Sequence, residues 1–412
     1  MNSPELNWQS HERTGFVQRL VETEALSALL LVGGLMAAIA WASLSASSYS
    51  AFITTPVHLP GVPHHVVGDL SSLSANGFMV LFFFAIGLEL ARERTSGALS
   101  ERSSAILPVA SALGGMAGAA GVFVIVATLF GEGGHLAGWG IPMPTDVALG
   151  LAALSLSANP AAGRLRVFLL ALAVADDVAS VIVLAFASHS GEAVSAAVVV
   201  SCWVALAVLF ALGLLARRRG VGPWWFVALL VPMWWALARL GIEPTLAGVA
   251  VGFLAPSGDD PQLPGLRLER VVAPLSAFVV LPLFALLAAG VDLSAQPWAG
   301  QSGLVIALVA ARVVGKAMGI VLAAVVVVRL GFGGLPAQVR WRHLGAMGVF
   351  CGIGFTVSLL FAEAAFGTQP ALMGATKVAL IGASVLCAVI GLVLMAATNE
   401  RVSPRAPDPS DS

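Results

Sequence analysis

The segment LRVFLLALAVADDVASVIVLAFAS, residues 165–188, decides the fold class because it is long enough to cross a bilayer and carries two adjacent carboxylates in its middle. At ~1.5 Å of rise per residue, Asp176 lies about 17 Å from the start of the segment, near the middle of a hydrocarbon core about 30 Å thick. An ionisable group at that depth costs roughly 2.5–3.5 kcal/mol on insertion scales. Asp176 and Asp177 therefore indicate an intramembrane functional site.

The composition of the whole chain is that of a membrane protein. Of its 412 residues, 58% are hydrophobic and 10% are charged, and the mean hydropathy is +0.93. Soluble domains carry about 25% charged residues, so the sequence predicts an all-α polytopic membrane protein. Residues 1–24 are polar and lack the apolar stretch of a removable signal peptide, and we expect them to be cytoplasmic. Residues 25–397 then form the transmembrane domain, and residues 398–412 form a disordered cytoplasmic tail.

Apolar windows predict about twelve transmembrane helices, at residues 25–45, 71–91, 104–130, 139–158, 165–188, 193–216, 222–239, 242–256, 273–290, 303–328, 343–366 and 372–397. The cations support this number. Of the 21 Lys and Arg residues, only Arg239, Arg312, Lys316 and Lys377 do not fall at one set of alternate span ends. The positive-inside rule then places both termini in the cytoplasm.

The remaining deep charges are Asp146 in the fourth span, Arg312 and Lys316 in the tenth, and Lys377 in the twelfth. Neighbours on a helix diverge by about 100°, so Asp176 and Asp177 cannot both face one partner. Lys316 lies at a similar depth and is expected to pair with one of them, while the other faces water. Ion pairing and desolvation shift the proton affinity of a carboxylate in opposite directions, so a cation and protons can compete for such a site.

Helix breakers interrupt two of the predicted spans. In GIPMPTDVALG, Pro142 and Pro144 remove backbone donors, and in VFCGIGFTVS, Gly352 and Gly354 weaken the eleventh span. Broken helices inside a membrane are tolerated where they line protein or water. The breaks fall in the middle spans of triplets 3–5 and 10–12. The chain is therefore predicted to contain inverted-topology repeats whose two discontinuous helices cross near the midplane.

The ends of the half-helices carry partial charges, which Asp146 and Lys316 can neutralise. Thr145 has two interpretations: a cation ligand through its hydroxyl, or a cap on a half-helix.

The combined segments resemble the NhaA family of sodium/proton antiporters from about residue 22 to residue 397. The resemblance is carried by FFFAIGLELARE (82–93), GIPMPTDVALG (140–150), LALAVADDVASVIV (170–183), TLAGVAVGF (245–253), LPLFALLAAGVDL (281–293), VVGKAMGI (313–320) and CGIGFTVSLL (351–360). It implies an electrogenic antiporter of the bacterial inner membrane, without a cofactor, that expels Na⁺ or Li⁺ in exchange for protons.

The resemblance also implies residue roles. Asp176 and Asp177 bind the cation and protons, with Asp177 the closer cation ligand. Lys316 pairs with Asp176, and Thr145 and Asp146 lie at the crossing of the broken helices.

The resemblance further implies activation at alkaline pH through charged groups at a cytoplasmic funnel, here Glu89, Arg92, Glu93 and Glu269. Salt links at an exposed helix end are the alternative interpretation of the first three. Members of the family also tend to form homodimers through a hairpin in the first outside loop, here within residues 46–69.

Four positions depart from the family pattern. Asn76 stands where many members carry Asp, Pro144 replaces a small residue, and Arg270 stands where a histidine is frequent. Arg312 adds a second deep cation one helical turn from Lys316. It either competes for the aspartate pair or points toward lipid or the outer surface.

Two other functions fit the sequence less well. A sodium-coupled symporter of an organic solute could use a similar inverted-repeat scaffold, but it would need a further pocket for the solute. An intramembrane enzyme is disfavoured because Asp176 and Asp177 are followed by Val178, Ala179 and Ser180, without the second acidic group of a prenyltransferase or a Gly-x-Gly-Asp protease signature.

Overall fold

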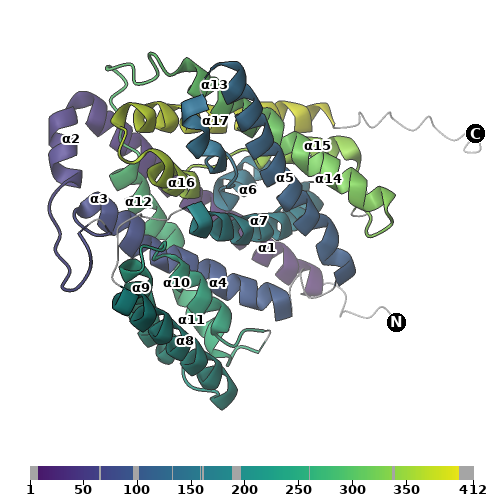
Figure 1. Cartoon of the computed structure of the whole chain (residues 1–412). Helices are drawn as coiled ribbons and strands as arrows, with labels where there is room; N and C mark the ends of the chain where they lie inside the picture. Colours follow the sequence, from purple (N-terminus) through teal and green to yellow (C-terminus); the bar gives the residue numbers. More distant parts are fainter. Residues whose placement is uncertain are drawn as a thin grey trace, which may run out of the picture.

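The computed structural model describes residues 8–64, 66–95, 102–131, 133–157, 159, 162–187, 196–258, 260–335 and 339–398. These residues form a helical bundle without strands (Figure 1). An isolated β-bridge pairs Pro56 with Asp69.

In chain order, the elements are α1 (Trp8–Leu44), α2 (Ala46–Ile53), α3 (Leu70–Leu73), the π-helical turn η2 (Ser74–Phe78), α4 (Met79–Thr95), α5 (Arg102–Leu129), the 3₁₀-helix η3 (Gly133–Gly140), α6 (Val147–Ser155), α7 (Ala162–Ala187), α8 (Ala196–Arg219), α9 (Trp224–Arg239), α10 (Leu246–Leu254), α11 (Pro264–Leu275), the π-helical turn η4 (Ser276–Val280), α12 (Leu281–Ala288), α13 (Ser302–Ala310), the π-helical turn η5 (Ala311–Lys316), α14 (Ala317–Arg329), α15 (Trp341–Phe350), α16 (Thr356–Phe366) and α17 (Pro370–Ala397).

Eight helical stretches among the described residues are long and apolar enough to cross a membrane, namely Ala25–Leu44, Leu70–Thr95, Ala105–Leu129, Leu165–Ala185, Val199–Arg219, Pro264–Ala288, Ser302–Arg329 and Pro370–Ala397. Many of their large apolar side chains are exposed, as expected for surfaces that face lipid. The protein is therefore a multi-pass membrane protein. The other four predicted spans contain shorter helices: η3 and α6, α9, α10, and α15 with α16.

The first predicted span, 25–45, is confirmed as the apolar stretch Ala25–Leu44, and α1 continues before it as far back as Trp8. Leu, Glu, Gln and Arg in the preceding polar stretch are good helix formers. The ninth predicted span differs from the structure at its start. α11 begins at Pro264, so Glu269 lies inside a candidate span rather than before it. The outside loop 46–69 begins with α2, and the antiparallel bridge between Pro56 and Asp69 brings the two ends of its remaining segment together. Of the predicted tail 398–412, residues 399–412 lie outside the described part of the chain, as do residues 1–7 of the N-terminal segment.

The helices fall into two groups in Figure 1, with α4 and α8–α11 on one side and α13–α17 on the other.

Close helix contacts position the tenth predicted span. α5 packs along α14 and η5, where Gly114 and Gly118 face Gly315 and Gly319 with backbone against backbone. Small residues let two helices approach this closely inside a membrane. The contact holds η5, and therefore Lys316, against the bundle interior.

Candidate functional site

The two helix breaks cross each other. η3 ends at Gly140 and α6 begins at Val147, while α15 ends at Phe350 and α16 begins at Thr356. The intervening segments, 141–146 and 351–355, touch through their backbones: the Asp146 amide donates to the Ile353 carbonyl at 2.9 Å. The hydroxyl of Thr145 donates to the carbonyl of Cys351 at 2.8 Å. Non-helical backbone at this depth is thus paired with other non-helical backbone, as buried peptide groups require.

Asp146 precedes α6, but its carboxylate binds the N-terminal end of α16, a half-helix of the other broken span. Its backbone occupies the N-cap position of α6, but its side chain makes no cap hydrogen bond there. Instead the carboxylate accepts hydrogen bonds from the amides of Phe355 and Thr356 and from the hydroxyl of Thr356. A carboxylate at the N-terminus of α16 satisfies unpaired amides and opposes the positive end of the helix dipole.

The hydroxyl of Thr145, which precedes α6, likewise contacts a half-helix of the other broken span, α15. Its acceptor, Cys351, is the C-cap residue of α15, and α6 receives no side-chain cap from Thr145. The cap interpretation of Thr145 therefore needs one correction: the hydroxyl pairs with the C-terminal end of α15, not with the N-terminus of α6. The reason is that the first amides of α6 and the last carbonyls of α15 meet at the crossing.

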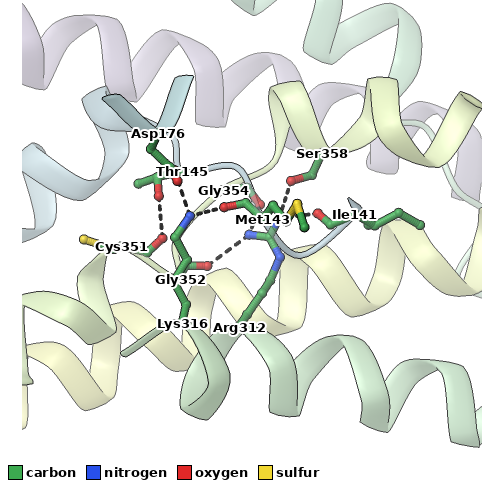
Figure 2. Close-up of polar contacts among 10 residues, drawn as sticks. All are labelled: Ile141, Met143, Thr145, Asp176, Arg312, Lys316, Cys351, Gly352, Gly354 and Ser358. Atoms are coloured by element: carbon green, nitrogen blue, oxygen red, sulfur yellow. Dashed lines mark hydrogen bonds and ion pairs between the residues drawn. The ribbon is translucent and has the colours of Figure 1, made fainter. Parts of the chain in front are cut away.

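Lys316 and Asp176 form an ion pair at this crossing, with 2.8 Å between Nζ and Oδ2. Both side chains are fully buried, and Lys316 also donates to the Met143 carbonyl in the segment before α6 (Figure 2). The ammonium therefore joins α7 to the broken fourth span. A buried pair of this kind requires good geometry and further hydrogen bonds to offset the desolvation of both charges.

Asp177 points elsewhere, as expected for neighbours on a helix. Its side chain is 7% exposed, whereas that of Asp176 is fully buried. Within the described part of the chain, one oxygen of each carboxylate, Oδ1, lacks a hydrogen-bond partner. Unpaired carboxylate oxygens are ligands that alkali cations and protons can both use. The pair therefore offers unsatisfied anionic groups next to a single ammonium.

The role of Arg312 could not be read from the sequence. The side chain is fully buried, so it faces neither lipid nor the outer surface. Its guanidinium donates to backbone carbonyls of the two discontinuous spans and to the Ser358 hydroxyl, and not to the aspartate pair. The one available signal was its position a helical turn from Lys316, on the same π-helical turn.

The expected cytoplasmic cluster is partly assembled. Arg92 Nε lies 3.0 Å from Glu269 Oε1 on α11, and its Nη2 lies 3.5 Å from Glu93 Oε1. Glu89 lies on α4, about one turn before Arg92 and Glu93. The alternative interpretation, salt links at the exposed end of one helix, involved α4 alone and did not include this link between α4 and α11.

The other three departures from the family pattern lie in different environments. The side chain of Asn76 donates to the Val66 carbonyl at 2.7 Å, in the first outside loop. Pro144 is buried in the segment that crosses Gly354, while Arg270 is exposed on α11.

Comparisons with known proteins give a consistent result. The family described as Na⁺/H⁺ antiporter 1 matches residues 18–395. The Na⁺/H⁺ antiporter NhaA 2 of Frankia alni is 37% identical over 396 residues, which cover 93% of this chain and 78% of that protein. The NhaA 1 antiporter of Klebsiella pneumoniae is 34% identical and the NhaA antiporter of Cronobacter sakazakii 36% identical, each over 92% of this chain and at least 95% of the relative. The broken helices, the buried charges and these matches together show that the chain belongs to the NhaA family of Na⁺/H⁺ antiporters.

Proposed function

We propose that this protein exchanges Na⁺ or Li⁺ for protons, with cation and protons competing for Asp176 and Asp177. The observation that carries the proposal is the buried Lys316–Asp176 pair beside the unpaired oxygen of Asp177. A cation that binds these carboxylates must displace either protons or the Lys316 ammonium. Occupation by one ligand therefore excludes the other, which is the requirement for exchange at a shared site.

The exchange is proposed to be electrogenic. Two adjacent carboxylates can together take up more than one proton in place of one monovalent cation, so each cycle moves net charge inward. The membrane potential, at about 2.3 kcal/mol per charge per 100 mV, then drives the expulsion of sodium. Asp146 and Thr145 support the site by holding the crossing segments.

The fold behind this mechanism is proposed to comprise twelve transmembrane helices with inverted repeats. The first repeat consists of α5, the broken span with α6, and α7. The second consists of α13 with α14, the broken span with α15 and α16, and α17. In each, the middle span is interrupted, which supports the assignment. We place the protein in a bacterial inner membrane, with both termini cytoplasmic.

Two regulatory features complete the proposal. Alkaline pH activates transport through Glu89, Arg92, Glu93 and Glu269, supported by the ion pair that joins α4 to α11. A homodimer forms through the outside loop 46–69, which projects at the edge of the bundle at α2 (Figure 1).

Everted membrane vesicles from cells without their own sodium/proton antiporters test the exchange. Addition of Na⁺ or Li⁺ should release protons from vesicles with the wild-type protein, seen as dequenching of a pH-sensitive dye. Asp177→Asn should abolish this response. Asp292→Asn, which alters a loop carboxylate bound to Ser294, is the matched control and should respond like wild type. Full dequenching by Asp177→Asn would contradict the proposal, as would sodium-dependent uptake of an organic solute without proton release.

A further inference from the structure

Arg312 occupies a cage of oxygen acceptors at the helix crossing. Its Nη1 lies 3.0 Å from the Gly352 carbonyl and 2.6 Å from the Gly354 carbonyl, and its Nη2 lies 3.3 Å from the Ile141 carbonyl. Nη2 also donates to the hydroxyl of Ser358 on α16. The acceptors thus belong to the break in the fourth span, to the break in the eleventh span, and to α16, the half-helix after that second break.

The chemistry of this cage favours a guanidinium. The C-terminal end of a helix carries partial negative charge, and Gly352 follows directly after Cys351, the C-cap residue of α15. The carbonyls of Gly354 and Ile141 add two further acceptors. Arginine presents a planar fork of donors that can contact several acceptors at fixed angles, whereas the ammonium of lysine is a single point of charge. Glycine at position 354 leaves room for the fork, because a Cβ there would approach Nη1 of Arg312.

Lys316 lies one turn from Arg312 on η5, and Figure 2 shows both side chains entering the crossing from the same stretch of helix. Lys316 already donates to the Met143 carbonyl, two residues from the Ile141 carbonyl that Arg312 uses. If the cage were empty, Lys316 would be the nearest cation to its carbonyls. Its ammonium would then be drawn away from Asp176.

We propose that Arg312 is a positioning residue, which holds the two broken spans together and thereby keeps Lys316 on Asp176. The first part of this inference concerns the fold alone. The second part, an effect on cation binding, rests on the proposed antiport.

The charged and titratable groups near Arg312 come from several elements. Asp146 at the start of α6, Asp176 on α7 and Cys387 on α17 interact with it electrostatically, and Lys316 lies one turn away on η5. Asp177 follows Asp176 on α7, and Cys351 follows α15. Among them, the aspartate pair and Lys316 are the groups through which a change at Arg312 should reach the cation site.

The native cysteines report on the crossing without any measurement of transport. Cys351 is fully buried at the break and accepts the Thr145 hydrogen bond, while Cys202 lies on α8, away from the crossing. N-Ethylmaleimide is applied to membranes with the full-length protein, and alkylation of Cys351 is quantified by mass spectrometry relative to Cys202. Arg312→Met removes the charge and the fork, Arg312→Lys retains the charge, and Arg329→Met changes an exposed arginine at the end of the same span as the matched control.

Arg312→Met should increase Cys351 alkylation at least about threefold, the effect expected when hydrogen bonds from a charged donor are lost. Arg312→Lys should give an intermediate value, and Arg329→Met should match wild type. Unchanged alkylation in Arg312→Met would overturn the inference. If that variant does not reach the membrane, Ser358→Ala removes one acceptor of the cage, and unchanged Cys351 alkylation in this variant would overturn the inference equally.

Transport gives the second readout. Without Lys316 nearby, Asp176 should hold protons more tightly, so Arg312→Met should raise the Na⁺ concentration for half-maximal exchange about threefold to tenfold and move the pH profile to higher pH. The maximal rate at saturating Na⁺ and high pH should change less. Unaltered sodium dependence with raised alkylation would refute the effect on Lys316. Raised alkylation in Arg312→Met, with no antiport by the wild-type protein, would leave the positioning role intact and refute the proposed function.

Discussion

Asp146 lies immediately before α6, yet its carboxylate accepts hydrogen bonds from both the amide and the hydroxyl of Thr356, the first residue of α16. One broken span thus supplies the helix cap of the other. Together with the Asp146–Ile353 backbone bond, this relationship couples the ends of two segments that are far apart in the sequence. The cap gives Asp146 a structural function in addition to any contact with a transported ion.

The exchange of Asp146 for Asn should therefore weaken the fold as well as transport. An asparagine oxygen can still accept a hydrogen bond, but it lacks the charge that opposes the N-terminus of α16. The loss should be about 0.5–2 kcal/mol in unfolding free energy, the range for helix caps. Thermal unfolding in detergent measures it. Thr356→Ala should lower stability by a similar amount, and wild-type stability in both variants would contradict the cap.

The pairing of Lys316 with Asp176 predicts a strongly non-additive double-mutant cycle. Lys316→Ala leaves a buried carboxylate without its partner and should cost about 3–5 kcal/mol of stability. Asp176→Asn in the Lys316→Ala background removes that uncompensated charge and should recover much of the loss. Thermal melts of the wild type, both single variants and the double variant provide the four values. Simple additivity would mean that the two groups do not interact.

The glycine contact between α5 and α14 should tolerate no added methyl group. A Cβ at Gly118 would overlap backbone atoms of Gly315 and Gly319, and overpacking of this kind costs about 1–3 kcal/mol. Gly121, on the same helix, faces open space. Gly118→Ala should therefore lower the melting temperature, whereas Gly121→Ala should leave it unchanged or stabilise the helix by up to ~1 kcal/mol. Equal effects of the two changes would argue against the close contact.

The Arg92–Glu269 pair should affect pH response more than stability. Its side chains are 33% and 17% exposed, so removal of the Glu269 charge should cost less than about 1 kcal/mol. Glu269→Gln resembles the protonated, low-pH form, and its activation curve should shift to higher pH. Proton release from vesicles at a series of pH values measures the curve. Asp260→Asn, in the loop before α11, is the control, and superimposable curves for Glu269→Gln and wild type would remove this pair from the sensor.

Tyr49 should anchor α2 to the bundle up to strongly alkaline pH. Its hydroxyl donates to the carbonyls of Leu286 and Leu287 and accepts from the Gly290 amide. Burial raises the pKa of Tyr49 above 10.0, so its contribution to stability is complete below pH 10.0 and is lost as the pH rises through the higher pKa of the folded protein. Tyr49→Phe should cost about 0.5–1.5 kcal/mol at neutral pH and lessen the decline above pH 10.0. Melts of both proteins across this range test the anchor.

Local sequence patterns were sufficient for the class of the molecule and the places where its helices break. Long apolar runs predict membrane helices because a span needs about 20 apolar residues. Pro142 and Pro144 lack a backbone donor, and Gly352 and Gly354 lower helix propensity, whatever their surroundings in the folded protein. The aspartate pair stood out for the same reason: its cost in lipid does not depend on its neighbours in space. Helix ends were less predictable, as at Pro264, where α11 begins before the predicted span 273–290, because helix propensity continues past the membrane boundary.

The tertiary structure alone decided which polar groups meet. No local pattern indicates that Asp146 caps α16, that Thr145 pairs with the end of α15, or that Arg312 binds carbonyls rather than a carboxylate. The N-terminal end of a half-helix can bind any carboxylate, and its C-terminal end any hydroxyl or cation, that packing brings next to it. Those partners are fixed by how the two broken spans cross, through contacts between residues about 200 positions apart, and periodicity along the chain carries no information about them.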